Sequence, residues 1–480
     1  MSSQHRITVA KGDGIGPEIT SAVMDILQAA NVPLEYDQID IGESVYLRGV
    51  SSGIPQDAWD VIRRNKVLLK GPITTPQGGG YKSVNVTLRK TLNLFANVRH
   101  CKSYAPFVAS AHPGMNLIVI RENEEDLYAG IEHQQTQEVV QTLKLVSRPG
   151  CERIVRYAFE YARAYGRKKV TCMTKDNIMK HTDGLFHKVF DEIGENYPEV
   201  EKEHHIIDIG TARLATQPEN YDVIVTLNLY GDILSDVAAQ VSGSVGLAGS
   251  TNIGSKAAMF EAVHGSAPDI AGKGVANPSG LLLAAVQLLV HVGLPEHATK
   301  IKNAWLRTIE DGIHTMDLYR EGSRQRLVGT QAFAESVIER LGQMPDHLEP
   351  VTYQGEGLTI PETKHTPVKK ELVGIDVFLD WSEPGRNPDT LGHQLEGVTP
   401  SELVLKMITN RGVKVFPEGL PETACTDHWR CRFVSQRGAV EFSTLLNLQR
   451  QISEAGLDVI KTENLYTFAG ERGYSLGQGE

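Results

Sequence analysis

Cysteine, aromatic residues and excess positive charge are all scarce in this chain. Only 5 of its 480 residues are cysteines, scattered and odd in number, which argues against a disulfide framework and indicates reduced thiols. Cys425 and Cys431 flank His428 as a candidate metal group, but no second pair completes a zinc site, which favours ordinary buried thiols. The net charge of -11 argues against nucleic acid as a partner, because phosphate binding requires concentrated Lys and Arg.

Long apolar runs are also missing. No stretch reaches the ~18–20 residues that span a membrane, and the most apolar one, residues 281–292, is expected to be a buried helix. The N-terminus, MSSQHRITVAKGDG, lacks a basic segment followed by an apolar one, so no secretory signal is expected. These absences predict a cytoplasmic protein with no membrane contact.

What the chain does contain is an alternation of apolar strands and helices. ITVA is followed by a glycine-rich loop and a helix, and later helices are expected near 177–193 and from Asp232 onward. This alternation predicts an α/β fold. The loop KGDGIGPE does not have the G-x-G-x-x-G spacing, which argues against a Rossmann dinucleotide fold.

The C-terminal quarter differs in composition. Residues 343–372 are rich in Pro, Gly and charge and are typical of a linker. Beyond it we expect a small α+β module with the order strand, helix (399–412), two strands, helix (441–456) and strand. Its residues predict no chemistry.

Two aspartates in LNLYGDILSDVAAQ, Asp232 and Asp236, are four positions apart and therefore share one helix face. Like charges at this spacing repel by a few tenths of a kcal/mol. Either a cation lies between them, or Asp232 is a capping charge favoured by the helix dipole. The residues alone leave both interpretations open.

Residues 71–100 combine short hydroxyls, glycines and arginines, and another arginine follows in RENEEDLYAG. Arg89, Arg99 and Arg121 have the donor geometry to bind several carboxylates in a bidentate manner. A second segment, 259–280, offers small residues that allow a ligand close to the backbone, and Asp269, which can accept from ribose hydroxyls. An ordinary surface loop is the alternative for this second segment.

These motifs together resemble one family. KGDGIGPE, ITTPQGGGYKSVNVTLRK, RENEEDLYAGIEH, KDNIMKHTDG, NLYGDILSDVAAQ and FEAVHGSAPDIAGKGVANP occur in the order found in the β-decarboxylating dehydrogenases, above all those that act on isocitrate. The resemblance covers roughly residues 5–345, and the C-terminal module resembles the extension of a bacterial subgroup. It implies an isocitrate/isopropylmalate dehydrogenase-like, non-Rossmann α/β fold. Its expected parts are a large domain (1–94 and 243–345) and a small domain (95–242, with a dimer-forming clasp) around a cleft, a linker (346–372) and the module (373–480).

The resemblance also implies site residues. Substrate carboxylates are expected to bind Thr75, Ser83, Asn85, Arg89, Arg99 and Arg121. Mg²⁺ or Mn²⁺ is expected to bind Asp232, Asp236 and the Asp208 of a partner subunit. The nicotinamide nucleotide is expected beside Thr74, Asn177, His264, Gly265, Ser266, Ala267, Asp269, Ile270 and Asn277. Tyr128 is expected to act as the acid, and Lys175, reaching across from the partner, to assist proton transfer, so that the unit is at least a homodimer with shared active sites.

The implied reaction is the metal-dependent oxidative decarboxylation of isocitrate to 2-oxoglutarate and CO₂. Ser83 and Asn85 suit its third carboxylate, whereas an isopropylmalate enzyme presents an apolar face there. Asp269 and Ile270 replace the Lys-Tyr pair of NADP-dependent members, and Met316 replaces a second Tyr, which predicts NAD as the cofactor. Arg320 keeps NADP as the alternative. The competing interpretations of the whole chain are a homoisocitrate or isopropylmalate dehydrogenase and a non-catalytic regulatory or RNA-binding protein on the same fold.

Overall fold

The computed structural model describes residues 5–75, 83–354, 358 and 366–477, which belong to two compact units. The first unit comprises residues 1–128, 145–178 and 182–363, and the second comprises 129–144, 179–181 and 364–480. Each unit has its own apolar core. No helix in the described residues is long and apolar enough to cross a membrane. The division of the first unit into a large and a small domain, with boundaries at residues 94 and 243, remains a prediction.

A ten-stranded mixed sheet forms the centre of the first unit. Its strands, in spatial order, are β2 (Leu34–Ile39), β1 (His5–Ala10), β3 (Val67–Lys70), β12 (Ala258–Ala262), β11 (Gly249–Ile253), β4 (Ala96–Lys102), β5 (Asn116–Glu122), β10 (Val223–Thr226), β8 (Lys169–Thr174) and β9 (Glu201–Ile206). The pairs β12–β11, β11–β4 and β4–β5 are antiparallel, and the others are parallel. This order confirms the predicted α/β class.

Both faces of the sheet are apolar because alternate residues of each strand enter different cores. In β5, Ile118 and Ile120 belong to one cluster, whereas Leu117 and Val119 belong to another. Such a strand therefore reads as a continuous apolar run, typical of strands covered by helices on both faces.

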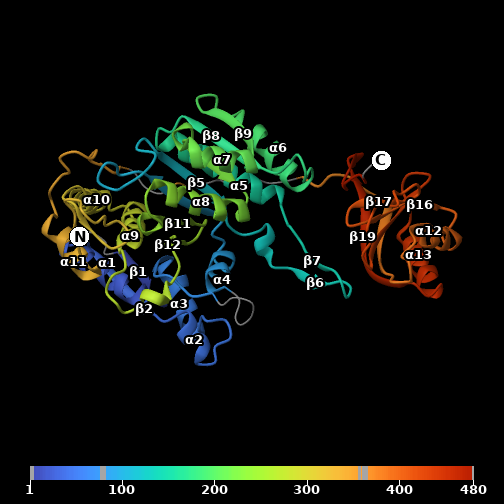
Figure 1. Cartoon of the computed structure of the whole chain (residues 1–480), viewed down its shortest axis with the longest axis horizontal. Coiled ribbons are helices and arrows are strands. Elements are labelled where there is room, and N and C mark those ends of the chain that lie inside the picture. Colours follow the sequence, from blue (N-terminus) through green and yellow to red (C-terminus); the bar gives the residue numbers. More distant parts are fainter. Residues whose placement is uncertain (1–4, 76–82, 355–357, 359–365, 478–480) are drawn as a thin grey trace. The chain divides into compact units, whose positions relative to one another are not determined.

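Helices cover both faces of this sheet (Figure 1). They are α1 (Gly16–Ala29), α2 (Glu43–Leu47), α3 (Gln56–Asn65), α4 (Val84–Thr91), α5 (Arg148–Ala164), α6 (Thr182–Gly194), α7 (Ile207–Thr216), α8 (Asn228–Ser242), α9 (Ser279–His291), α10 (Pro295–Glu310) and α11 (Thr330–Glu339). Helix α9 is the predicted buried helix: ten of its residues are buried, including Leu281, Leu282 and Leu288.

Helix α8 begins earlier than predicted. It starts at Asn228 and has no acidic residue in its first turn. Asp232 therefore lies in the second turn, where the dipole of the helix terminus has largely faded. The interpretation of Asp232 as a capping charge is wrong for this reason.

The second unit contains a six-stranded antiparallel sheet. Its strands, in spatial order, are β17 (Val413–Phe416), β16 (Leu403–Asn410), β18 (His428–Ser435), β15 (Lys370–Asp380), β19 (Asp458–Phe468) and β20 (Glu471–Arg472), and its helices are α12 (Pro388–Gly397) and α13 (Phe442–Glu454). The helix predicted at 399–412 is wrong. Residues 403–407 alternate between buried and exposed, the period of a strand, and the helix lies upstream, capped by Asn387 before Pro388.

The hairpin of β6 (Glu132–Gln134) and β7 (Val140–Thr142) belongs to this second unit. The buried carboxylate of Asp427 accepts from the Thr136 hydroxyl at 2.6 Å and from the Glu138 backbone N–H at 3.3 Å. Arg386 donates to both carboxylate oxygens of Glu138, at 2.6 and 2.9 Å. Charge-assisted hydrogen bonds thus attach the hairpin to the C-terminal sheet.

Candidate active site

The glycine-rich loop between β1 and α1 joins two segments that are distant in sequence. Gly12 and Gly14 have positive φ angles of 73° and 57°. A Cβ on Gly12 would lie 2.1 Å from the Pro72 carbonyl oxygen, and a Cβ on Gly14 would lie 2.0 Å from the Ser266 carbonyl oxygen. The N–H of Ile15 also donates to the Ser266 carbonyl at 2.9 Å. Only glycine permits these approaches. The loop thus braces the candidate substrate and nucleotide segments against each other.

Asp13, in the same loop, orients Thr74. Its carboxylate accepts from the N–H of Thr74 at 3.0 Å and from that of Glu43 at 3.1 Å. The Thr74 hydroxyl lies 2.9 Å from that of Ser266. Sequence reasoning missed Asp13, although an aspartate between two glycines is a common backbone acceptor.

Asp232 is the centre of the candidate site. Arg121 and the hydroxyl of Tyr128 both donate to its carboxylate. Arg99 reaches Asp232 at 3.2 Å and Asp236 at 3.0 Å, so one guanidinium bridges the two aspartates. The structure therefore brings together five of the predicted residues, from β4, β5, α8 and the 3₁₀ turn after β5.

Charge and burial set the proton affinities in this group. Burial alone would raise the pKa of Asp232, but Arg121 and Arg99 outweigh it and the pKa lies below its usual value. Burial raises the pKa of Tyr128. The charge of Arg121 lowers this pKa, whereas Asp232 raises it further. Tyr128 therefore keeps its proton at neutral pH and remains a proton donor.

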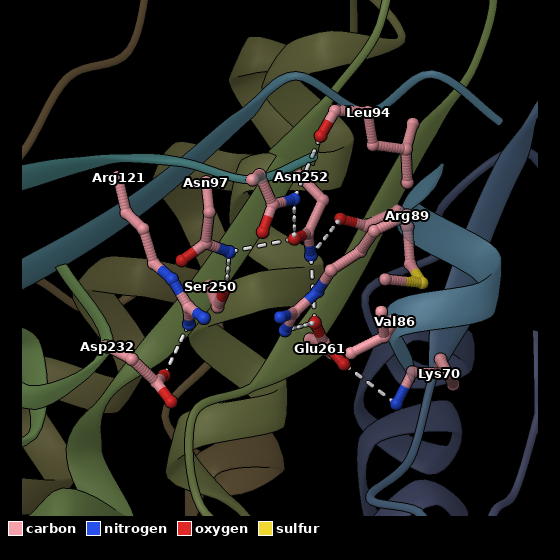
Figure 2. A network of polar contacts seen from close by, with 12 residues as sticks. Lys70, Val86, Arg89, Leu94, Asn97, Arg121, Asp232, Ser250, Asn252 and Glu261 are labelled. Atoms are coloured by element: carbon pink, nitrogen blue, oxygen red, sulfur yellow. Dashed lines mark hydrogen bonds and ion pairs between the residues drawn. The ribbon is translucent and has the colours of Figure 1, made fainter. Parts of the chain in front are cut away.

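The two arginines are held in place by amides and a hydroxyl. Arg121, 0% exposed, donates to the Asn228 side-chain oxygen at 2.7 and 3.1 Å. Arg99 donates to Asn97 at 2.8 Å and to the Ser235 hydroxyl at 2.6 Å. Figure 2 shows Arg121 above Asp232, with Asn97 beside them. Fixed guanidiniums of this kind lose little entropy when they bind an anion.

Arg89 belongs to a buried network that Asn97 links to Arg99, by donating to Asn252 at 2.8 Å. Arg89 donates to Glu261 at 2.9 Å, and Lys70 contacts the other oxygen of that carboxylate at 2.7 Å. Asn252 donates to Glu261 as well, at 2.9 Å (Figure 2). Sequence reasoning missed Lys70 and Glu261, although a charged residue inside an otherwise apolar strand was a usable signal.

The start of α4 supplies the remaining substrate residues. Ser83 caps the helix by accepting from the N–H of Val86 at 3.4 Å, and it accepts from the Thr75 hydroxyl at 3.3 Å. The side-chain oxygen of Asn85 and Nε of Arg89 are buried without a hydrogen-bond partner in the described chain. Buried polar atoms are normally paired, so these two are available to a ligand.

The candidate nucleotide segment runs from the end of β12 to the start of α9. Ala267 has a positive φ of 40°, a strained conformation typical of functional loops. His264 Nε2 is buried and has no partner in the described chain, whereas Asp269 and Gly265 are exposed and Asp269 and Ile270 lie in a 3₁₀ turn. Asn277 is buried and donates to Asp317 at 3.0 Å, which ties this segment to the loop that carries Arg320.

Lys175 and Asp208 form a pair of their own. Lys175 Nζ lies 3.1 Å from the Asp208 carboxylate, which is 67% exposed in the first turn of α7. Lys175 lowers the pKa of Asp208 by hydrogen bonding. Within the described chain, no hydrogen bond or ion pair connects this pair to the Asp232 group. Asn177, two positions further, is exposed.

The carboxylates of α8 fit a hard divalent cation. They are oxygen donors on one helix face, and Asp236 is 63% exposed, so water can complete the shell. The one group of three convergent carboxylate or imidazole ligands in the described residues lies elsewhere, at Asp176, His187 and His204. The Asp232 site therefore offers two carboxylates from one chain.

This mixed α/β sheet carries buried arginines beside two helical carboxylates, an arrangement suited to an enzyme that acts on an acidic substrate with a divalent cation. Residues 6–337 match the family described as isocitrate/isopropylmalate dehydrogenase, and the chain belongs to it. Residues 370–480 match the C-terminal domain described for bacterial isocitrate dehydrogenase.

Individual relatives refine the comparison. The chain is 53% identical to "Isocitrate dehydrogenase [NADP]" of Rickettsia bellii, over 99% of each chain. It is 46% identical to "Isocitrate dehydrogenase [NAD] subunit 2, mitochondrial" of Saccharomyces cerevisiae, over 71% of this chain and 91% of that one. The crystal structure of the TT0538 protein from Thermus thermophilus superposes with a TM-score of 0.90 at 43% identity, over 99% of this chain and 96% of that one.

Proposed function

We propose that this chain is an isocitrate dehydrogenase that oxidises and decarboxylates isocitrate to 2-oxoglutarate with NADP. The observation that supports it best is the convergence of Arg99 and Arg121 on Asp232. Isocitrate carries three carboxylates, and guanidiniums that pair with aspartates in the free chain can transfer to them when a cation takes the aspartates. Asp232 and Asp236 would hold Mg²⁺ or Mn²⁺, which would supply Lewis-acid catalysis when bound.

The residues of the chain then have separate tasks. Arg89, Arg99 and Arg121 orient the substrate, and their burial excludes competing water. Tyr128, whose pKa is raised by burial, holds the proton that completes 2-oxoglutarate after CO₂ leaves. Thr74 and His264 would lie beside the nicotinamide ring, which would supply the hydride acceptor when the nucleotide is bound.

The comparisons do not support the sequence-based expectation that NAD is the cofactor. The full-length relative from Rickettsia bellii is named for NADP, and the yeast relative named for NAD aligns over only 71% of this chain. The expectation depended on the missing Lys-Tyr pair at Asp269 and Ile270, on Met316 in place of a second Tyr, and on repulsion between Asp269 and a 2′-phosphate. Asp269 is exposed, so water and salt screen that repulsion, and Arg320 and Lys273 are exposed in the same pair of loops.

Replacing Arg320 with Ala should raise the KM for NADP about ten- to hundredfold, the range that follows from losing one charge-assisted hydrogen bond of about 1.5–3 kcal/mol. The KM for NAD, which has no 2′-phosphate, should change less than about twofold in the same variant and serves as the control. Steady-state kinetics with both nucleotides at saturating isocitrate checks this. A wild-type enzyme with equal or higher kcat/KM for NAD contradicts the choice of NADP.

Replacing Ser83 with Asp should lower kcat/KM for isocitrate about hundredfold or more. Asp keeps the N-cap of α4, but it sets an anion against a substrate carboxylate, which costs about 3 kcal/mol at short range. Ser83→Asn is the matched control: it caps equally well, has the same shape as Asp and carries no charge. Equal activity of the Asp and Asn variants would show that no carboxylate binds at Ser83.

We also propose that each site is shared between two subunits, because the described residues place no third convergent ligand at Asp232 and the Lys175–Asp208 pair is not bonded to it. Coexpression of Lys175→Ala with Asp232→Asn should restore activity, since a hybrid dimer contains one intact site. Each variant alone should be nearly inactive. Hybrids no more active than the two parents would place both groups in one chain.

The deciding assay uses isocitrate, Mn²⁺ and either nucleotide, with EDTA as the metal-free control. Production of 2-oxoglutarate and NADPH that EDTA abolishes supports the proposal. Turnover of isopropylmalate without turnover of isocitrate, or full activity in EDTA, overturns it.

A further inference from the structure

A second group of ligating side chains lies at the edge of the large sheet, apart from the acid-binding residues. Asp176 follows β8, His187 lies on α6, and His204 lies on the edge strand β9. Strands β8 and β9 are parallel, with Cys172 opposite His204, and α6 packs against both strands. The topology therefore brings three residues from different elements to one place.

The potential ligand atoms of this group lie close together, and the Thr174 hydroxyl also contacts His204 Nε2 at 2.8 Å. His187 Nδ1 lies 2.7 Å from one oxygen of Asp176, and His204 Nε2 lies 3.8 Å from the other. One ligand atom from each residue lies within 4.8 Å of the other two. The imidazole rings are stacked, with centroids 3.6 Å apart and planes 15° apart.

Burial lowers the pKa of His204, and the neighbouring His187 lowers it further. Neutral imidazole is the form that binds metal ions. The nearby charges are Asp191, 3.7 Å from His187 Nε2, and Lys202, 4.0 Å from Asp191.

We propose that Asp176, His187 and His204 form a site for a borderline transition-metal ion such as Zn²⁺. Two imidazoles and one carboxylate are a ligand set that Zn²⁺ accepts, with water in the fourth position, whereas Mg²⁺ prefers oxygen donors. One ring must rotate out of the stack to direct its lone pair at the ion. Both side chains, 27% and 21% exposed for His187 and His204, reach solvent.

Such an ion would bind next to a residue assigned to proton transfer. Asp176 follows Lys175 directly, and the Lys175 backbone N–H donates to Asp183 at 2.7 Å. Metal binding at Asp176 therefore fixes the segment from which Lys175 reaches Asp208. Zn²⁺ bound here is expected to inhibit the enzyme, and this inhibition rests on the proposed function. Zn²⁺ binding itself does not rest on it, so binding and inhibition can fail separately.

The test is calorimetric titration of the untagged, metal-free, full-length protein with Zn²⁺ in excess Mg²⁺, which fills the oxygen site at Asp232. We expect one Zn²⁺ per chain, and a visible tetrahedral spectrum when Co²⁺ is used instead. His187→Gln and His204→Gln should each weaken binding at least about hundredfold, because losing a direct ligand costs no less than losing a group that only supports one. Asp176→Asn should also weaken it and keeps the shape of the site if a histidine variant unfolds.

Two matched variants should bind Zn²⁺ as the wild type does. His205→Gln changes the neighbouring histidine of β9, which contacts Tyr221 at 2.9 Å instead. The double variant Asp232→Asn/Asp236→Asn removes the oxygen site. Unchanged Zn²⁺ binding in all three single variants, or binding that disappears only in the double variant, overturns the proposal.

Discussion

Replacing Asp232 with Asn is expected to lower kcat/KM for isocitrate at least about a thousandfold, more than the 10- to 100-fold typical of residues that only support a metal ligand. The carboxylate is a candidate metal ligand, and it also neutralises Arg99 and Arg121, both buried. An amide of the same shape loses both interactions. The expected result is lost Mn²⁺ affinity, measured by the electron paramagnetic resonance of free Mn²⁺, together with lost turnover.

Tyr128→Phe separates metal binding from proton transfer. It removes the hydroxyl that donates to Asp232 but leaves both carboxylates of α8. Mn²⁺ affinity should stay within about threefold of the wild type while kcat falls about 10²–10⁴-fold, the range for a general acid. Asp232→Asn with unchanged Mn²⁺ affinity would mean that the cation binds elsewhere.

Replacing Glu261 with Gln should destabilise the first unit by about 3–5 kcal/mol, the range for breaking a buried ion pair. Glu261 is 4% exposed, and its carboxylate is the shared partner of Lys70 and Arg89, which are 0% and 8% exposed. Gln fills the same volume but leaves two buried cations without an anion. Urea denaturation, followed by a probe in the first unit, measures the loss.

The matched control is Asp60→Asn, which removes an exposed carboxylate from a pair with Arg63 and should cost less than about 1 kcal/mol. If Glu261→Gln does not fold, Glu261→Gln with Lys70→Met should recover part of the stability, because one buried charge is then removed with its partner. Equal free energies of unfolding for Glu261→Gln and the wild type would contradict the account of this network.

The contact of Glu261 with Lys70 and Arg89 also predicts that the free energy of unfolding depends on pH. Burial alone would raise the pKa of Glu261, but Lys70 and Arg89 outweigh it and hold the pKa far below the ordinary 4.5. The folded chain therefore binds this proton less readily than the unfolded chain, so the stabilisation is complete above about pH 4.5 and declines below it. The difference between wild type and Glu261→Gln should accordingly shrink on acidification.

The sequence predicted some residues of this site and missed others. Arg99, Arg121, Tyr128, Asp232 and Asp236 were predicted from motifs, and the structure brings them into contact. Asp13, Lys70 and Glu261 were not predicted, because their partners are distant in sequence: Glu261 lies 172 positions from Arg89. The helix wrongly expected at 399–412 shows the same limit, since the segment is a strand because it pairs with β18, which lies further along the chain.

The sequence by itself determined the α/β class, the family motifs and the chemistry that each side chain can supply, because these depend on residue type, period and spacing. The tertiary structure decided which charges meet. It placed two guanidiniums on one aspartate, buried Lys70 and Arg89 against Glu261, and stacked His187 on His204 beside Asp176. Ion pairing and metal ligation act over a few ångströms in space, and only the folded sheet brings strands from distant parts of the chain to that distance.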